Sequence, residues 1–194
     1  EINNELKELE YEQRREVVRI LTRFTDTIRP DLPAIRESGD FLTTMDFIRA
    51  KARFALANDC TLPIVGEGSS VSLRSARHTL LAQTLRREGK PIVPLDLTLT
   101  PEKHILVISG PNAGGKSVCL KTVGLLQYML QRGFLVSASE NSEMGLFEDI
   151  FIDIGDEQSI DNDLSTYSSH LLNMKNILRH AGSRSLILID EFGT

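Results

Sequence analysis

Eight consecutive residues, from Gly110 to Ser117, constrain this chain of 194 residues more than any other feature. They read Gly-Pro-Asn-Ala-Gly-Gly-Lys-Ser, which fits the pattern of Gly, four residues, Gly, Lys, and Ser or Thr. The apolar run at residues 104–108 predicts a buried strand before them. The spacing of apolar residues over 116–132, followed by Gly133, predicts a helix after them. A strand, a glycine-rich turn and a helix in this order predict a loop that wraps a polyphosphate.

Each part of the loop has a physical role in that prediction. Backbone N–H groups must point at the anion, so side chains must be small and φ must be free at the glycines. The helix presents its partly positive N-terminus. Lys116 adds a full charge for the β and γ phosphates, and the Ser117 hydroxyl is placed to bind Mg²⁺. The alternative is a chance glycine turn before a helix. The predicted nucleotide-binding residues are Gly110, Pro111, Asn112, Ala113, Gly114, Gly115, Lys116, Ser117 and Val118.

A second pattern is an apolar strand that ends in two carboxylates. Residues 185–189 are predicted to form a buried strand, and Asp190 and Glu191 follow it directly. At a strand end, Asp190 is placed to bind Mg²⁺ and Glu191 to orient the attacking water as the catalytic residue. By itself this pattern also fits acids that start a surface loop. The phosphate-loop pattern upstream favours the functional interpretation.

Hydroxyl side chains at residues 165–169 precede a helix predicted over 169–181. One interpretation is that they are ordinary helix N-caps. The functional interpretation is that Ser165 and the helix N-terminus face a γ-phosphate bound by another subunit.

Further patterns predict the remaining elements. Residues 1–29 and 40–57 have the apolar spacing of helices, with Asp40 as an N-cap. Residues 91–99 predict an edge strand because they contain two prolines. Short strands are also predicted at residues 134–136 and 150–152. From residue 104 onward, strands alternate with helices, which predicts an α/β fold with a parallel sheet covered on both faces.

Composition restricts the classes of function. The net charge is −5, and residues 140–163 contain nine acidic residues and no Lys or Arg. This stretch would repel a phosphate backbone, so we expect nucleic-acid contacts, if any, mainly elsewhere. No apolar run is long enough to cross a bilayer. The two cysteines, Cys60 and Cys119, have no metal-ligand spacing, which favours a reduced, cytoplasmic protein. The first residue, Glu1, and the end directly behind an apolar strand predict a piece of a longer protein.

Taken together, these motifs resemble the MutS family of ABC-type ATPases. The loop has the family's form. The segments Asp-Ile-Gly-Asp-Glu-Gln-Ser-Ile (residues 153–160) and Leu-Ser-Thr-Tyr-Ser-Ser-His (residues 164–170) resemble its second, recombination-suppressing bacterial branch more than its mismatch-repair branch. Residues 4–10 and 45–53 resemble that branch's core and lever helices. The resemblance covers nearly the whole chain.

The resemblance implies a P-loop NTPase fold with a parallel or mixed sheet and flanking helices. Residues 1–62 would be a helical core and lever region, and residues 63–194 the N-terminal part of the ATPase domain, cut after the Walker B strand. It also implies ATP and Mg²⁺ as ligands and a homodimer with composite sites. In those sites four residues of the Walker A loop would bind ATP and Mg²⁺: Asn112, Gly115, Lys116 and Ser117. Asp190 would bind the metal, Glu191 would act on the water, and Ser165 would reach the partner's nucleotide.

The function implied is nucleotide-driven closure of a dimer on branched or mismatched DNA, with hydrolysis by the full-length dimer and little or none by this piece alone. The DNA contacts would lie mainly outside it. Two alternatives stay open. One is an ATPase that acts on stalled ribosomes, and the other is a non-hydrolysing structural fragment.

Overall fold

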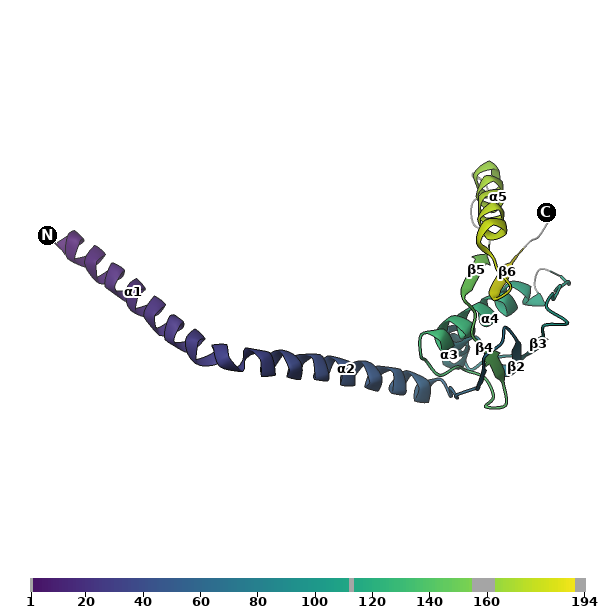
Figure 1. Cartoon of the computed structure of the whole chain (residues 1–194), viewed down its shortest axis with the longest axis horizontal. Coiled ribbons are helices and arrows are strands. Elements are labelled where there is room, and N and C mark those ends of the chain that lie inside the picture. Colours follow the sequence, from purple (N-terminus) through teal and green to yellow (C-terminus); the bar gives the residue numbers. More distant parts are fainter. Residues whose placement is uncertain (1, 112–113, 155–162, 191–194) are drawn as a thin grey trace. The chain divides into compact units, whose positions relative to one another are not determined.

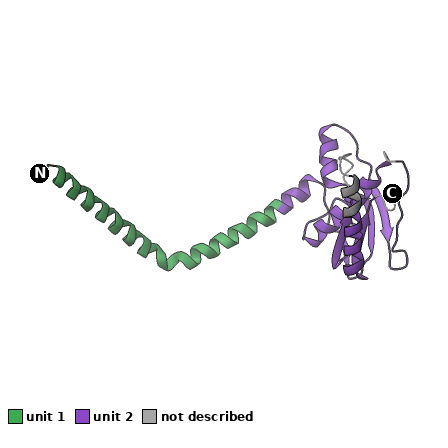
Figure 2. Ribbon diagram, turned by 90° about the horizontal axis from the view of Figure 1, so that it is seen from above, with its two compact units in different colours: residues 1–50 green, residues 51–194 purple. Residues whose placement is uncertain are grey.

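The computed structural model of the chain describes residues 2–111, 114–154 and 163–190, and for residues 163–169 it describes the helical backbone only. The chain forms two compact units, residues 1–50 and residues 51–194 (Figure 2). Figure 1 labels most of the elements.

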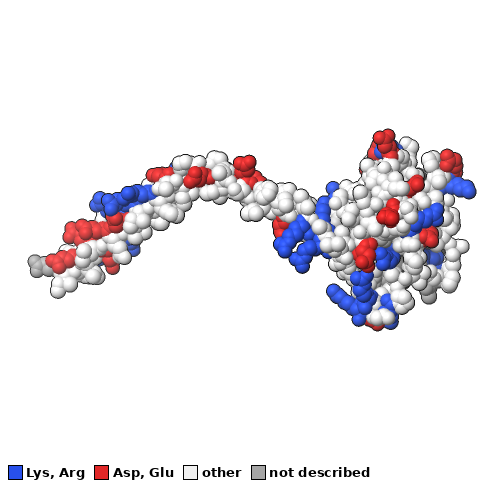
Figure 3. Space-filling view, turned by 90° about the horizontal axis from the view of Figure 1, so that it is seen from below, with Lys and Arg blue, Asp and Glu red and all other residues white. Residues whose placement is uncertain are grey.

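The first unit is helical. It contains α1 (Ile2–Ile28), the single 3-10 turn η1 (Arg29–Asp31) and most of α2 (Leu32–Ala57). The helix predicted over residues 1–29 is confirmed, and Pro30 lies in the turn that follows it. None of the residues 2–50 is buried, so the apolar stripe of α1 is exposed to solvent. Acidic and basic side chains both lie along this part of the chain (Figure 3).

The predicted start of the second helix is wrong. α2 begins at Leu32, so Asp40 lies inside the helix and is not its N-cap. Pro33 falls in the first turn of α2, where its missing N–H would have no intrahelical partner in any case. A proline between the two predicted helices is therefore compatible with an earlier helix start.

The second unit contains a mixed four-stranded sheet in the order β1-β4-β2-β3. Its strands are β1 (Ile64–Gly66), β2 (Val71–Ala76), β3 (Leu95–Leu99) and β4 (Glu143–Gly145). β2 pairs antiparallel with both β3 and β4, whereas β1 pairs parallel with β4. The edge position predicted for residues 91–99 is confirmed for β3, but the strand begins only after both prolines. α3 (Thr79–Arg87) connects β2 to β3.

A separate two-stranded sheet pairs β5 (Asp149–Asp153) in parallel with β6 (Ser185–Ile189), in a register that joins Asp153 to Ile189. α5 (Asp163–His180) links these two strands. The strands predicted at 150–152 and 185–189 are thus confirmed. The described part of the chain has two small sheets instead of the single parallel sheet that was expected.

Two predicted strands are wrong. Residues 104–108 form no strand, and Ile105 and Val107 are 76% and 83% exposed instead of buried. A buried apolar strand needs at least one neighbouring strand and cover on its faces, and the described residues do not supply these for residues 104–108. Residues 134–136 contribute only an isolated antiparallel bridge between Val136 and Thr61.

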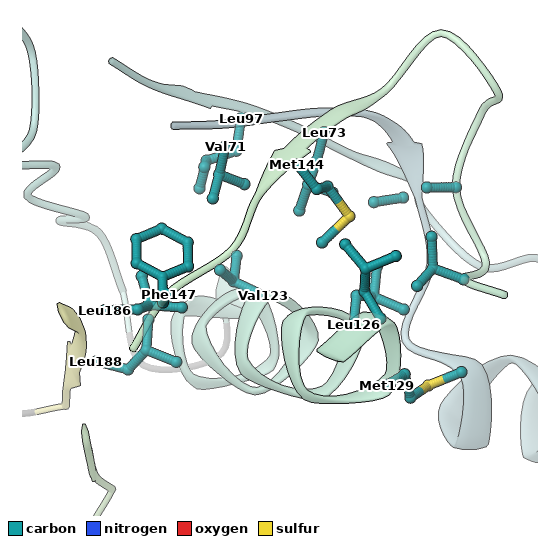
Figure 4. Packing of buried hydrophobic residues seen from close by; sticks show 14 residues of the cluster. Val71, Leu73, Leu97, Val123, Leu126, Met129, Met144, Phe147, Leu186 and Leu188 are labelled. Atoms are coloured by element: carbon teal, nitrogen blue, oxygen red, sulfur yellow. The ribbon is translucent and has the colours of Figure 1, made fainter. Parts of the chain in front are cut away.

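α4 (Lys116–Gln131) packs against both sheets and organises the core of the second unit. The helix predicted over residues 116–132 is confirmed, and Gly133 ends it in a left-handed conformation with φ of 71°. In Figure 4, Val123 and Leu126 of α4 face Leu73 and Met144 of the four-stranded sheet. The other side of the same cluster contains Phe147, Leu186 and Leu188. None of the described helices has the length and apolar character needed to cross a bilayer.

Candidate phosphate-binding site

The glycine-rich loop has backbone conformations that favour glycine at both of its ends. Gly110 has φ of 151° and Gly115 has φ of 81°, and a Cβ atom at either residue would meet nothing within 4 Å. These two positions therefore need glycine for its backbone freedom and not for lack of space. Between them the Gly114 N–H donates to the Pro111 carbonyl at 2.9 Å. Asn112 and Ala113 lie outside the described residues.

Gly115 is also the N-cap of α4, and it supplies no side-chain hydrogen bond to the first turn. The first N–H groups of a helix have no intrahelical partners, and together with the helix dipole they attract an anion. Ser117 and Val118 lie in this first turn, directly behind the loop.

Lys116 closes the loop. Its Nζ atom donates a hydrogen bond of 2.6 Å to the carbonyl oxygen of Gly110, the first residue of the motif. The Lys116 side chain therefore reaches across the loop, from the start of α4 to Gly110. A positive charge is fixed beside the amides that the sequence predicts to bind phosphate.

Contacts at two levels fix the direction of α4 relative to β5. Near the C-terminal end of α4, Gln131 bonds both backbone groups of Phe147, which lies just before β5; the bonds measure 3.0 Å to the N–H and 3.1 Å to the carbonyl. About two turns earlier, a Cβ atom on Gly124 would lie 3.6 Å from the side chain of Ile152, near the end of β5. α4 and β5 therefore run in opposite senses.

β6 confirms this direction. The same Cβ atom on Gly124 would lie 2.8 Å from Leu188, which pairs with Ile152 near the ends of the two parallel strands. Farther towards the start of α4 lie Lys116 and Ser117, and just beyond Leu188 lies Asp190. The start of α4, which carries the loop, and the C-terminal end of β6, which carries Asp190, thus lie at the same end of the two-stranded sheet.

Asp190 is held in place through its backbone. Its N–H donates to the carbonyl oxygen of Asp153 at 2.9 Å, which extends the pairing of β5 and β6 by one residue. The Asp190 side chain is half-buried. Glu191, the predicted catalytic residue, lies outside the described part of the chain.

Ser165 lies within α5, which begins at Asp163. The helix thus starts earlier than the predicted 169, and the hydroxyl residues that were expected to precede it form its first turns. The side chain of Ser165 lies outside the described residues.

One group of interacting polar side chains at the end of β5 was not predicted from the sequence. The carboxylate of Asp153 is 3% exposed and is bound on both oxygens by residues of α5. His170 Nδ1 lies 2.9 Å from Oδ2, and Asn173 Nδ2 donates to Oδ1 at 3.0 Å. Burial acts to raise the pKa of Asp153, but the hydrogen bonds from His170 and Asn173 outweigh it and hold the pKa below its usual value. The available signal was the spacing of His170 and Asn173, three residues apart on one helix face.

Comparison with known proteins agrees with the motifs. A family model described as MutS domain V matches residues 106–194. The chain is 46% identical over its whole length to endonuclease MutS2 of Carboxydothermus hydrogenoformans. It is 44% identical to endonuclease MutS2 of Finegoldia magna and 41% identical to that of Latilactobacillus sakei. Each match covers the whole of this chain and 24% of the relative, so the chain spans about a quarter of the relatives' length. The chain is thus similar to these MutS2 proteins over its whole length, and to the MutS domain V model over residues 106–194.

Proposed function

We propose that this chain is part of an ATP-binding and ATP-hydrolysing protein of the MutS family, and that residues 110–118 bind the nucleotide's phosphates. The observation that best supports the proposal is the direction of α4, which turns its loop end and Lys116 towards the same end of the sheet as Asp190. The match of residues 106–194 to MutS domain V supports it independently.

The described residues fit a polyphosphate. Gly110 and Gly115 leave open space where a Cβ atom would otherwise stand, so a ligand can approach the backbone closely. The uncapped first turn of α4 offers its N–H groups, and Lys116 offers a point charge. In this proposal the backbone amides orient the phosphates, and Lys116 stabilises negative charge on the β and γ groups. Asn112 and Gly114 contribute to the same loop.

The donor set near the strand end fits Mg²⁺, which prefers hard oxygen ligands. We assign the Ser117 hydroxyl and the Asp190 carboxylate to the ion. When bound, Mg²⁺ would neutralise charge on the phosphates during transfer to water. Glu191, directly after Asp190, would orient that water and accept its proton. Ser165 would contact the nucleotide of a second subunit.

We extend the proposal to the full-length protein. It would act as a homodimer in which ATP binding closes the subunits on branched or mismatched DNA, with the DNA contacts mainly outside this chain. Residues 1–62 would form a helical core and lever region, and residues 63–194 would form part of the ATPase domain. The exposed apolar stripe of α1 suits a helix that packs against other parts of such an assembly.

The first experiment replaces Lys116 with alanine in the full-length protein and measures MgATP binding and thermal unfolding. At about 100 times the dissociation constant, the nucleotide should stabilise the wild type by about 2.7 kcal/mol. Lys116→Ala should lose this stabilisation and the hydrolysis. Lys121→Ala is the matched control, because Lys121 is an exposed residue of the same helix, beyond its first turn. Equal binding by Lys116→Ala and wild type would refute the proposed site.

The second experiment separates the alternatives by asking what the protein binds when MgATP is present. Preference for a four-way DNA junction over a linear duplex of equal length, lost in Lys116→Ala, would support the DNA function. ATP-sensitive binding to ribosomes without a preference for junctions would favour the ribosome alternative. No stabilisation by saturating MgATP in the wild type would favour the structural role.

A further inference from the structure

Asp153 connects two different parts of the molecule through three of its atoms. Its backbone carbonyl accepts the N–H of Asp190 at 2.9 Å, and its two carboxylate oxygens bind His170 and Asn173 of α5. It is the last residue of β5 and is nearly inaccessible to solvent. The nucleotide-binding role proposed above uses the carboxylate of Asp190 but leaves that of Asp153 without a function.

A buried carboxylate is retained only where hydrogen bonds replace the water it has lost. Here both oxygens have a partner, and both partners come from one face of one helix, a single turn apart. Two bonds at different heights on a helix fix its rotation about its own axis as well as its distance from the strand. The end of β5 therefore determines how α5 is turned.

Apolar packing restrains residues 170–180 of α5 only weakly. Among its side chains from residue 170 to 180, Ile177 alone is buried, whereas Leu171, Leu172 and Leu178 are all more than half exposed. The polar contact with Asp153 lies on the N-terminal side of Ile177, towards the segment that contains Ser165. It therefore adds a polar restraint to the part of α5 that begins at His170.

We propose that Asp153 is a positioning residue that couples α5 to the metal end of β6: its carboxylate fixes the helix through His170 and Asn173, while its carbonyl fixes the backbone of Asp190. This inference rests on the nucleotide-binding function proposed above. Asp153 would not touch the nucleotide. A displacement of α5 would change the position of Asp190, and loss of the carboxylate would loosen the magnesium ligand and the helix together.

The test uses Asp153→Asn in the full-length protein, with two readouts of the nucleotide site. The first is the Mg²⁺ concentration that gives half-maximal ATP hydrolysis. The second is the affinity for ATP in EDTA, which depends on the loop alone. Residues that orient a metal ligand typically contribute 10- to 100-fold to metal affinity or activity. We therefore expect the half-activating Mg²⁺ concentration to rise about tenfold or more, with the affinity for ATP in EDTA changed less than about twofold.

Asp149→Asn is the matched control, because Asp149 is the first residue of the same strand and its side chain is exposed at the opposite end. It should leave both readouts unchanged. His170→Ala and Asn173→Ala each remove one partner and should each reproduce part of the Mg²⁺ effect, whether or not Asp153→Asn folds. His170→Asn, which keeps a short donor on the helix, should restore part of the loss seen in His170→Ala.

A half-activating Mg²⁺ concentration within twofold of wild type in folded Asp153→Asn would overturn the coupling. An equal rise in Asp149→Asn would overturn it as well, because the effect would then come from lost charge alone. These results are distinct from failure of the proposed nucleotide site. If Lys116→Ala still binds MgATP, the site itself is wrong. If Lys116→Ala loses binding while the Asp153, His170 and Asn173 variants keep the wild-type Mg²⁺ requirement, only the coupling is wrong.

Discussion

The close approach of β4 to the segment after β1 makes a sharp prediction for Gly145. A Cβ atom on Gly145 would lie 1.8 Å from the carbonyl oxygen of Gly68 and 3.1 Å from the backbone nitrogen of Ser70. Contacts below 3.0 Å are essentially never seen for real Cβ atoms, so the two segments would have to separate by more than an ångström. The obstructing atom belongs to the backbone and cannot rotate away.

The expected cost for Gly145→Ala follows from two contributions. Overpacking of a closely fitted region costs about 1–3 kcal/mol. The separation would also strain the bond of 2.7 Å from the Gly145 N–H to the Ser70 carbonyl, which contributes about 1 kcal/mol. We expect a loss near 3 kcal/mol. For a domain of this size that corresponds to a melting temperature lower by about 6–12 °C.

Gly66→Ala provides the comparison. Gly66 pairs directly with Gly145 across the parallel ladder, and a Cβ atom there would meet nothing within 4 Å. Alanine in a strand should be neutral or slightly stabilising relative to glycine, by less than about 1 kcal/mol. The assay is thermal and urea unfolding of the full-length protein. Melting temperatures for the two variants that agree within 2 °C or so would refute the steric argument.

Three further changes test other features of the second unit. Gln131→Leu should lower the free energy of unfolding by about 2 kcal/mol, because both backbone groups of the buried Phe147 lose their partner. The measurement is urea unfolding, and an unchanged midpoint would show that water replaces the Gln131 amide. Gly133→Ala should lower the free energy of unfolding by about 1 kcal/mol, because the φ angle of Gly133 is 71°. Gly182→Ala, after α5, should lower it less, and equal losses in the two variants would contradict this expectation. Burial raises the pKa of the Cys60 and Cys119 thiols, so the folded protein keeps them protonated to higher pH than the unfolded chain does. Their contribution to stability should therefore fall as pH rises above about 8.5, and iodoacetamide should react more slowly with the folded than with the urea-unfolded protein at that pH; equal rates would refute this.

Helices were predicted well from local sequence because their hydrogen bonds are local. The periodic apolar residues of α1 and α4 specify each helix, and Gly133 specifies where α4 ends. The start of α2 was placed too late because Asp40 resembles a cap and Pro33 lies between the two predicted helices. Neither residue excludes a helix start at Leu32, since an exposed helix tolerates aspartate and its first turn tolerates proline.

Strands were predicted less well because they depend on partners that local sequence does not specify. Residues 104–108 have an apolar pattern at least as strong as that of β5, but β5 pairs with β6 and residues 104–108 pair with no described strand. Residues 134–136 fail for the same reason, with a single bridge at Val136. Pattern alone reports the tendency to be extended, and pairing decides the outcome.

The loop of the candidate site was found from spacing, because its eight residues are consecutive. The group around Asp153 was not found, because its partners His170 and Asn173 lie 17 and 20 residues away and make sense only when α5 is placed beside β5. Asp190 was predicted as a metal ligand from its place after a strand. Its backbone bond to Asp153 depends on the register of two parallel strands and is invisible in the sequence.

The two glutamines of α4 have a mechanical consequence. Gln127 donates to the carbonyl of Gly145 at the end of β4, and Gln131 bonds Phe147 just before β5. One helix therefore holds the short connection between β4 and β5, which lie in different sheets. The opposite end of that helix begins at the glycine loop. If a bound ligand displaces the first turn of α4, the helix would therefore carry that displacement to the segment between β4 and β5. Both sheets would then shift together.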